Sequence, residues 1–348
     1  MNVPWSTPDI GGRERDAVQR VLDSGWVSLG KETDELEREL RQFIRVPDVV
    51  VLNNGTSALT AALLLHNSWN PYKKKHLPAY TYQATLNAIY ASGGGQHRKF
   101  GVSDIQYLPV NPRTVLVHPP KTPTNDIYIP VSYAGLPLNK DDWKHLPDVV
   151  EDAAESFGAS SNGVRTGGQG WDTVFSFHAA KLISMIEGGA VAVTSREKGR
   201  ILREIRNQGE SLAEKGVFNG RGFNFKPSDI HSAVGRVQLR KVFKYIDQRE
   251  RVTRVYKEVL GEKVSYQEIP DYVERHGNMM FPVFIDDPVK VSNMLKVDGV
   301  STRVGWKPLI SDAGAEYVYN HVLCLPLYNT MTVEEAEYVS FKLLEAIK

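Results

Sequence analysis

The strongest constraint on the fold is a short, uninterrupted apolar strand that leads through a turn into a helix. Residues 49–52 read Val-Val-Val-Leu, and residues 58–65 are apolar and strongly helical. A continuous apolar run of this length is typical of a strand that is buried on both faces of a parallel sheet. The sequence therefore predicts a buried strand here, joined to its helix by the turn at residues 53–57 (Asn-Asn-Gly-Thr-Ser).

This turn is a candidate anion site. The first N–H groups of a helix have no partner within the helix, and the helix dipole favours negative charge at that end. Thr56 and Ser57 would add hydroxyl donors. Ordinary helix capping explains a threonine or a serine at this position equally well, so both interpretations stay open. The spacing of a P-loop is absent.

A second pair of predicted strands, residues 171–178 and 190–194, flanks a segment that carries Lys181. This segment contains no acidic residue before Glu187. Apolar surroundings disfavour the charged form of a lysine and lower its pKa, and a neutral amine can attack a carbonyl. Lys181 is therefore a candidate Schiff-base lysine, although a solvated loop lysine is the commoner case for such a pattern alone.

Polar and aromatic side chains also stand at the ends of other predicted strands. The strand at residues 148–152 ends in Glu151 and Asp152, and ligands of open α/β sheets bind beyond the carboxyl ends of the strands. Adjacent carboxylates repel, so one of the two needs a cationic partner. Tyr82 stands where a strand meets a helix and could stack on a planar ligand. The structural alternatives are a helix-capping Asp152 and a buried Tyr82.

Hydrophobic periodicity predicts most of the remaining elements. Residues 228–245 form a long predicted helix that continues to about residue 260, whereas residues 93–127 show no clear pattern. Further helices are predicted at residues 13–23, 31–44, 84–91, 198–207, 288–297 and 333–347, and further strands at residues 76–82, 126–133 and 279–285.

Length and composition limit the classes of function. A chain of 348 residues is too long for one small core, so we expect two domains, residues 1–240 and 241–348. The net charge of +1 gives no reason to expect nucleic acid as a partner. Cys324 is the single cysteine, which excludes an internal disulfide. With no signal pattern and no membrane-spanning apolar run, we expect a cytoplasmic location and no membrane partner.

Taken in order, the segments resemble the DegT/DnrJ/EryC1/StrS family, pyridoxal-phosphate-dependent sugar aminotransferases of fold type I. This resemblance implies an α/β fold: a large domain with a mostly parallel central sheet flanked by helices, and a small C-terminal α+β domain. The matching segments span nearly the whole chain and keep the order of the family: residues 8–11, 24–31, 54–59, 151–159, 175–181 with 187–190, 206–209, 222–230 and 322–327.

The resemblance implies a role for each matched position. Lys181 matches the lysine that holds the cofactor as a Schiff base and moves a proton. Asp152 matches the carboxylate that pairs with the pyridine nitrogen and keeps the ring an electron sink. Glu155 matches the position near the phenolic oxygen, where glutamine or histidine is frequent, and Tyr82 matches the aromatic that stacks on the ring. The phosphate cradle is matched by Gly55, Thr56, Ser57 and Ser176.

The resemblance also implies the reaction and the assembly. L-Glutamate would convert the cofactor to pyridoxamine phosphate, which would then aminate a nucleotide-linked keto-deoxy-sugar. Asn224 matches a residue that reaches the phosphate from the neighbouring subunit, so we expect a homodimer. By analogy within the family, residues 26–31 and 303–307 would help to hold the sugar nucleotide.

Two other functions stay open. Some relatives use pyridoxamine phosphate to dehydrate sugars, with a histidine in place of the lysine. Here the position is Lys181, and His178 lies three residues too early. A regulatory protein could bind the cofactor without turnover, although no DNA-binding segment is visible. The compressed stretch at residues 93–125 departs from the family pattern and bears on substrate specificity.

Overall fold

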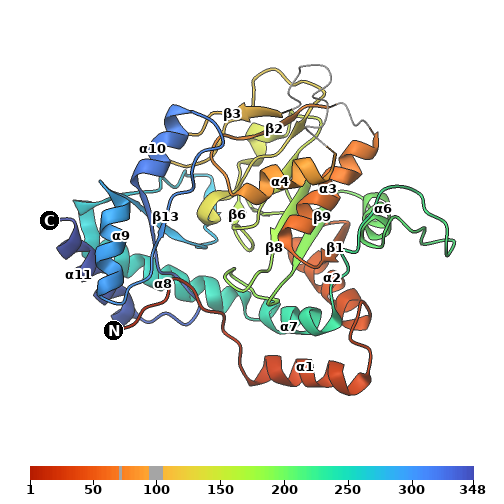
Figure 1. Cartoon of the computed structure of the whole chain (residues 1–348), viewed down its shortest axis with the longest axis horizontal. Coiled ribbons are helices and arrows are strands. Elements are labelled where there is room, and N and C mark those ends of the chain that lie inside the picture. Colours follow the sequence, from red (N-terminus) through yellow and green to blue (C-terminus); the bar gives the residue numbers. More distant parts are fainter. Residues whose placement is uncertain (70–72, 94–104) are drawn as a thin grey trace.

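Seven strands form the centre of the larger part of the molecule (Figure 1). The computed structural model describes residues 1–69, 73–93 and 105–348. Two hydrogen-bonded sheets, β3-β2-β4 and β1-β9-β8-β5, lie edge to edge, because parallel bridges join Tyr128 to Val149 and Val131 to Asp152. The strand bounds are β1 (Asp48–Leu52), β2 (Lys75–Pro78), β3 (Ile105–Leu108), β4 (Ile127–Tyr128), β5 (Val150–Asp152), β8 (Asp172–Ser176) and β9 (Gly189–Val193).

The resulting strand order is β3-β2-β4-β5-β8-β9-β1, and within it β9 runs against both of its neighbours. The pairs β2–β3, β2–β4 and β5–β8 are parallel. The predicted α/β class with a mostly parallel central sheet is therefore confirmed.

The apolar run in β1 is continuous because each face of the sheet packs against helices. Val50 and Leu52 join a cluster with side chains of α3 (Gly55–Trp69). Val49 and Val51 join a cluster with side chains of α2 (Lys31–Ile44) and α8 (Val242–Leu260). Successive side chains of a strand point to opposite faces, so a strand covered on both sides needs apolar residues throughout.

The helices flank this sheet and then lead away from it (Figure 1). Helix α8 runs from the large sheet towards the C-terminal part, where it packs against α11. The helix bounds are α1 (Gly12–Ser24), α2 (Lys31–Ile44), α3 (Gly55–Trp69), α4 (Gln83–Ala91), α5 (Lys140–Trp143), α6 (Arg196–Arg206), α7 (Asp229–Leu239), α8 (Val242–Leu260), α9 (Pro288–Val297), α10 (Ala313–His321) and α11 (Val333–Ala346).

The prediction of a single long helix over residues 228–260 is wrong, because α7 and α8 are separate helices. Between them the N–H of Lys241 bonds to the carbonyl of Gln238, three residues back, which tightens the turn. The Lys241 ammonium lies 2.6 Å from a carboxylate oxygen of Glu14 in α1. A tertiary contact therefore fixes the chain at the point where the helix breaks.

The C-terminal part is built on an antiparallel sheet in the order β10-β12-β14-β13, as the predicted small α+β unit requires. Val3 belongs to the apolar cluster of this part, so the first residues pack on the C-terminal unit. The division at 240/241 stays a prediction. The bounds are β10 (Ser265–Tyr266), β12 (Phe281–Phe284), β13 (Arg303–Val304) and β14 (Val322–Leu325); a third sheet contains β11 (Val273–Arg275), β6 (Ser160–Ser161) and β7 (Val164–Arg165).

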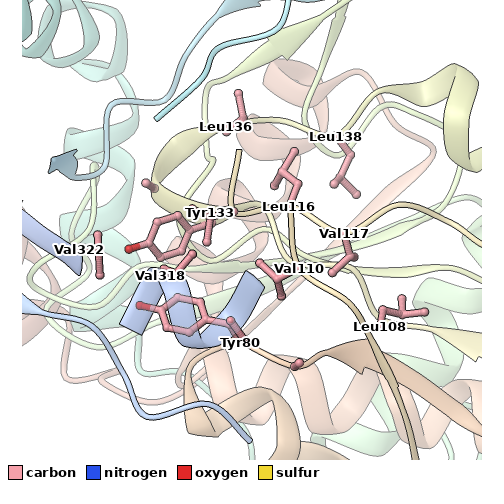
Figure 2. Close-up of a cluster of buried hydrophobic side chains, with 14 of the residues drawn as sticks. Tyr80, Leu108, Val110, Leu116, Val117, Tyr133, Leu136, Leu138, Val318 and Val322 are labelled. Atoms are coloured by element: carbon pink, nitrogen blue, oxygen red, sulfur yellow. The ribbon is translucent and has the colours of Figure 1, made fainter. Parts of the chain in front are cut away.

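One apolar cluster connects the two parts (Figure 2). Tyr80 and Tyr133 follow β2 and β4, and their rings lie 5.9 Å apart beside Val318 and Val322 of the C-terminal part. None of the helices in the described part of the chain combines the length and apolar composition that a bilayer crossing needs.

Candidate active site

Lys181 lies in the segment between β8 and β9, which is neither helix nor strand. Its side chain is 20% exposed, and its Nζ lies 3.6 Å from Oε1 of Glu155. The other oxygen of this carboxylate accepts a hydrogen bond of 2.9 Å from the N–H of Ala134. Two sequence-distant segments thus hold Glu155 beside the lysine, and the positive charge of Lys181 offsets the negative charge of Glu155.

Asp152 is the last residue of β5 and is buried. Its Oδ2 accepts a 2.8 Å hydrogen bond from the Thr85 hydroxyl, and its Oδ1 accepts one from the N–H of Ala154. Burial raises the pKa of Asp152, while the hydrogen bonds and the charge of Lys181 act to lower it. No cation of the described residues forms an ion pair with this carboxylate, so it is available to a positively charged ligand atom.

Asp152 does not cap a helix. Residues 153–158 form turns, so the alternative interpretation made from the sequence is wrong. Thr85, the partner of Asp152, was not predicted, although it lies one helical turn after Tyr82 and therefore at the same end of α4. That spacing is the signal that could have identified it.

The start of α3 meets the end of β8. The side-chain oxygen of Asn54 accepts a hydrogen bond from the N–H of Ser57 and thereby caps the helix. Thr56 and Ser57 consequently lie inside the first turn and are not its cap. A Cβ on Gly55 would lie 2.8 Å from Cβ of Ser176, so only glycine fits this approach. The predicted cradle residues Gly55 and Ser176 are thus adjacent.

Tyr82 is the residue before α4, and it is 59% exposed. The structural alternative of a buried aromatic is therefore wrong, and the ring is accessible to a ligand. The Tyr82 ring lies 5.4 Å from that of Trp306, which also stacks on Tyr80 at 5.6 Å. Trp306, from the predicted segment 303–307, thus reaches Tyr82 from the C-terminal part.

Asn224 is exposed and lies in the segment between α6 and α7, which extends outward next to α6 (Figure 1). Its neighbour Phe225 accepts a 3.0 Å hydrogen bond from the N–H of Asn53, one residue before the capping Asn54. The segment that carries Asn224 is therefore attached beside the cradle of its own chain, and which subunit's site Asn224 serves stays a prediction.

The comparison with protein families identifies the chain as an aminotransferase. A model of the DegT/DnrJ/EryC1/StrS aminotransferase family matches residues 8–344, and the chain belongs to this family. The chain is 28% identical over 327 residues to a GDP-perosamine synthase of Caulobacter vibrioides, covering 87% of this chain and 84% of that protein.

Solved structures agree with this fold. PseC of Helicobacter pylori, an aminotransferase involved in pseudoaminic acid biosynthesis, superposes with a TM-score of 0.88 at 21% identity, over 100% of this chain and 99% of that one. A putative sugar aminotransferase of Streptococcus pneumoniae, Spr1654 in its PMP form, gives a TM-score of 0.87 at 22% identity, over 99% of each chain.

Proposed function

We propose that this chain uses pyridoxal phosphate to move an amino group from L-glutamate to the keto group of a nucleotide-linked deoxy-sugar. The observation that carries the proposal is the contact of Lys181 with Glu155 near a buried, unpaired Asp152. An amine and a carboxylate are the groups that the aldehyde and the pyridine nitrogen of the cofactor require.

The residues present fit this cofactor. The unpaired carboxylate of Asp152 would pair with a protonated pyridine nitrogen, which offsets the cost of burying the charge. Because Gly55 has no Cβ, no side chain of its own stands over the N–H groups of residues 55 and 56 at the start of α3, and these groups would suit a phosphate, whereas the N–H of Ser57 is already bonded to Asn54. The exposed ring of Tyr82 would cover one face of the planar ring.

When bound, pyridoxal phosphate supplies an electron sink for the bond broken at the amino-bearing carbon. The Lys181 amine would carry a proton to and from that carbon as a general base and acid. The Glu155 carboxylate, fixed by the N–H of Ala134, would orient the lysine when its amine is free. Tyr82 would exclude water from one face of the site.

Support for a nucleotide-linked substrate comes from the relative whose name contains GDP-perosamine. Tyr82 and Trp306 offer two adjacent aromatic rings, tilted by 58°, and Arg303 of the same C-terminal segment has its guanidinium 5.2 Å from the ring of Trp5. Aromatic rings and a cation of this segment would suit a sugar diphosphate. We therefore place GDP-linked keto-deoxy-sugars first among the substrates to test.

The experiment is an absorption spectrum of the protein loaded with pyridoxal phosphate, before and after L-glutamate. Support would be a yellow, lysine-linked cofactor that borohydride traps on Lys181 and that bleaches when glutamate is added. The Lys181→Ala variant should bind cofactor without linkage and should lose at least about 10³-fold in rate. Cofactor bound without response to any amino donor would contradict the transaminase and favour a dehydratase or a regulatory protein.

A further inference from the structure

The segment that carries Lys181 has no regular structure, so other residues must fix its position. Its backbone is attached at separate points. The N–H of Lys181 bonds to the carbonyl of His178, and the N–H of Met185 bonds to the carbonyl of Phe177. On the N-terminal side of the lysine, the Ser6 hydroxyl donates to the carbonyl of Ala180. On its C-terminal side, an attachment from the C-terminal part holds the carbonyl of Leu182.

That attachment is made by Asn329, which follows β14 and is 8% exposed. Its Nδ2 donates a 2.9 Å hydrogen bond to the carbonyl of Leu182, the residue after the lysine. Its Oδ1 accepts a 2.8 Å bond from Nε of Arg249 in α8. Because a guanidinium only donates, the orientation of the Asn329 amide is fixed and its N–H₂ must face Leu182.

Arg249 is itself unusual. It is 1% exposed, and no carboxylate of the described residues forms an ion pair with it. Burial lowers its pKa. Its Nη1 donates to the carbonyls of Asn278 and Met279, at 2.9 and 3.1 Å. A buried cation is costly unless it is fully hydrogen-bonded, so these carbonyl and amide partners define its position narrowly.

The hydrogen bond of Arg249 to Met279 also leads back to Lys181, through Ala134 and Glu155. The N–H of Met279 bonds to the carbonyl of Ala134 at 3.1 Å. The N–H of Ala134 in turn holds the Glu155 carboxylate that faces Lys181. The contacts therefore close into a ring, whose members in order are Lys181, Glu155, Ala134, Met279, Arg249, Asn329 and Leu182.

We propose that Arg249 and Asn329 are positioning residues that set the distance between Lys181 and Glu155. Asn329 holds the backbone of Leu182, beside the lysine. Arg249 holds the backbone of Met279, which bonds to Ala134 and so to the Glu155 carboxylate. Neither residue touches the reacting atoms. The proposal rests on the role of Lys181 in the proposed function, but the structural link can be measured without turnover.

The test compares Asn329→Leu with a matched control in the same contact region. Gln248 precedes Arg249 in α8 and donates a 2.8 Å hydrogen bond to the carbonyl of Met331, two residues after Asn329. Gln248→Met therefore removes a side-chain bond to the same segment without reaching the lysine. The hydrogen-exchange rates of the backbone amides of residues 181–186, in protein without cofactor, measure directly how firmly this segment is held.

We expect Asn329→Leu to speed this exchange about tenfold, and Gln248→Met to leave it within about twofold of the natural protein. In loaded protein, the rate constant of the glutamate half-reaction should fall about tenfold while the apparent glutamate affinity changes little, since the lysine is misplaced and the donor site is intact. Arg249→Lys, which keeps the charge, should recover part of both effects relative to Arg249→Met.

The Asn329→Asp variant separates the hydrogen bond to Leu182 from the one to Arg249. The carboxylate keeps an acceptor for Arg249 but has no donor for the carbonyl of Leu182, so exchange should match that of Asn329→Leu. Equal exchange in Asn329→Leu and Gln248→Met would overturn the proposal. If exchange is fast in Asn329→Leu but the natural protein shows no transamination, the role of Asn329 in holding the Lys181 segment would stand and the proposed function would be refuted.

Discussion

Nε2 of His66, near the end of α3, forms a 2.8 Å ion pair with Oδ2 of Asp172 at the start of β8 in the protein interior. The other nitrogen of the ring forms an ion pair with Asp148. Burial acts to lower the pKa of His66, but the two carboxylates outweigh it and raise that pKa. The pKa values of Asp148 and Asp172 are lowered, mainly by His66, against the effect of burial.

The shifted pKa values of these three residues predict that the free energy of unfolding falls both at high pH and at low pH. A histidine whose pKa is raised on folding contributes stability that is present below about pH 6.5 and is lost as the pH rises through the folded value. The lowered pKa values of the aspartates contribute stability present above about pH 4 and lost as the pH falls. We expect the unfolding free energy to decline from pH 6.5 upward, as measured by denaturant titration.

The His66→Gln variant checks this prediction. It should cost about 1–3 kcal/mol near pH 6, because two buried carboxylates lose the imidazolium between them while each keeps an ion pair with a lysine, Asp148 with Lys73 and Asp172 with Lys198. Its stability should also be flatter between pH 6.5 and 9 than that of the natural protein. An unchanged slope in the variant would show that other groups cause the decline.

Thr85→Val should weaken cofactor binding. The hydroxyl of Thr85 is a hydrogen-bond donor to Asp152, and it acts against the rise in pKa that burial causes. Its loss leaves a less readily charged carboxylate for the pyridine nitrogen, so the dissociation constant should rise about tenfold, equivalent to about 1.4 kcal/mol. Titration with pyridoxal phosphate measures this, and Thr81→Val, which removes a hydroxyl bonded to that of Thr85 but not to Asp152, should have a smaller effect.

Gly55→Ala should disturb the cradle. The new methyl would lie 2.8 Å from Cβ of Ser176, an overpacking contact that costs about 1–3 kcal/mol. The double variant Gly55→Ala with Ser176→Gly should regain stability in thermal unfolding. It should not regain phosphate affinity, because the hydroxyl of Ser176 is gone; full recovery of binding would argue against a phosphate contact by that hydroxyl.

Mixing two inactive variants tests the proposed dimer. In a hybrid of Lys181→Ala and Asn224→Ala subunits, one site would combine a native lysine with a native asparagine from the neighbour. Activity should therefore reappear on mixing if Asn224 serves the neighbouring site. Absence of recovery, with hybrid formation verified by mass spectrometry, would assign Asn224 to the site of its own chain, beside which Phe225 is attached.

Sequence patterns predicted the helices whose bounds depend on local features, such as an apolar face or a cap. Helices at residues 31–44 and 288–297 agree with α2 and α9, which have a clear apolar face or a capping Asp287 with a proline in the first turn. The predicted strand at residues 126–133 shrinks to β4, since Pro130 has no N–H for the ladder. Residues 94–104 of the unclear stretch lie outside the described residues.

The site was predicted by residue type and order, but its geometry was not. Motifs indicated Lys181, Asp152 and Glu155, yet the pairing of Glu155 with both Lys181 and Ala134 depends on strands brought together by tertiary folding. Thr85 and Asn329 lie 67 and 147 residues from their partners, Asp152 and Leu182. No local pattern reports contacts of that separation.

Helix α3 lies along β8 and is held at both ends, by His66 with Asp172 and by Gly55 against Ser176. It contains 15 residues and is therefore about 22 Å long. By geometry, a tilt of about 3° about the histidine end would move the first turn by about 1 Å, a displacement large enough to impair catalysis. A charged group at the opposite end of β8 thus helps to fix the position of the cradle.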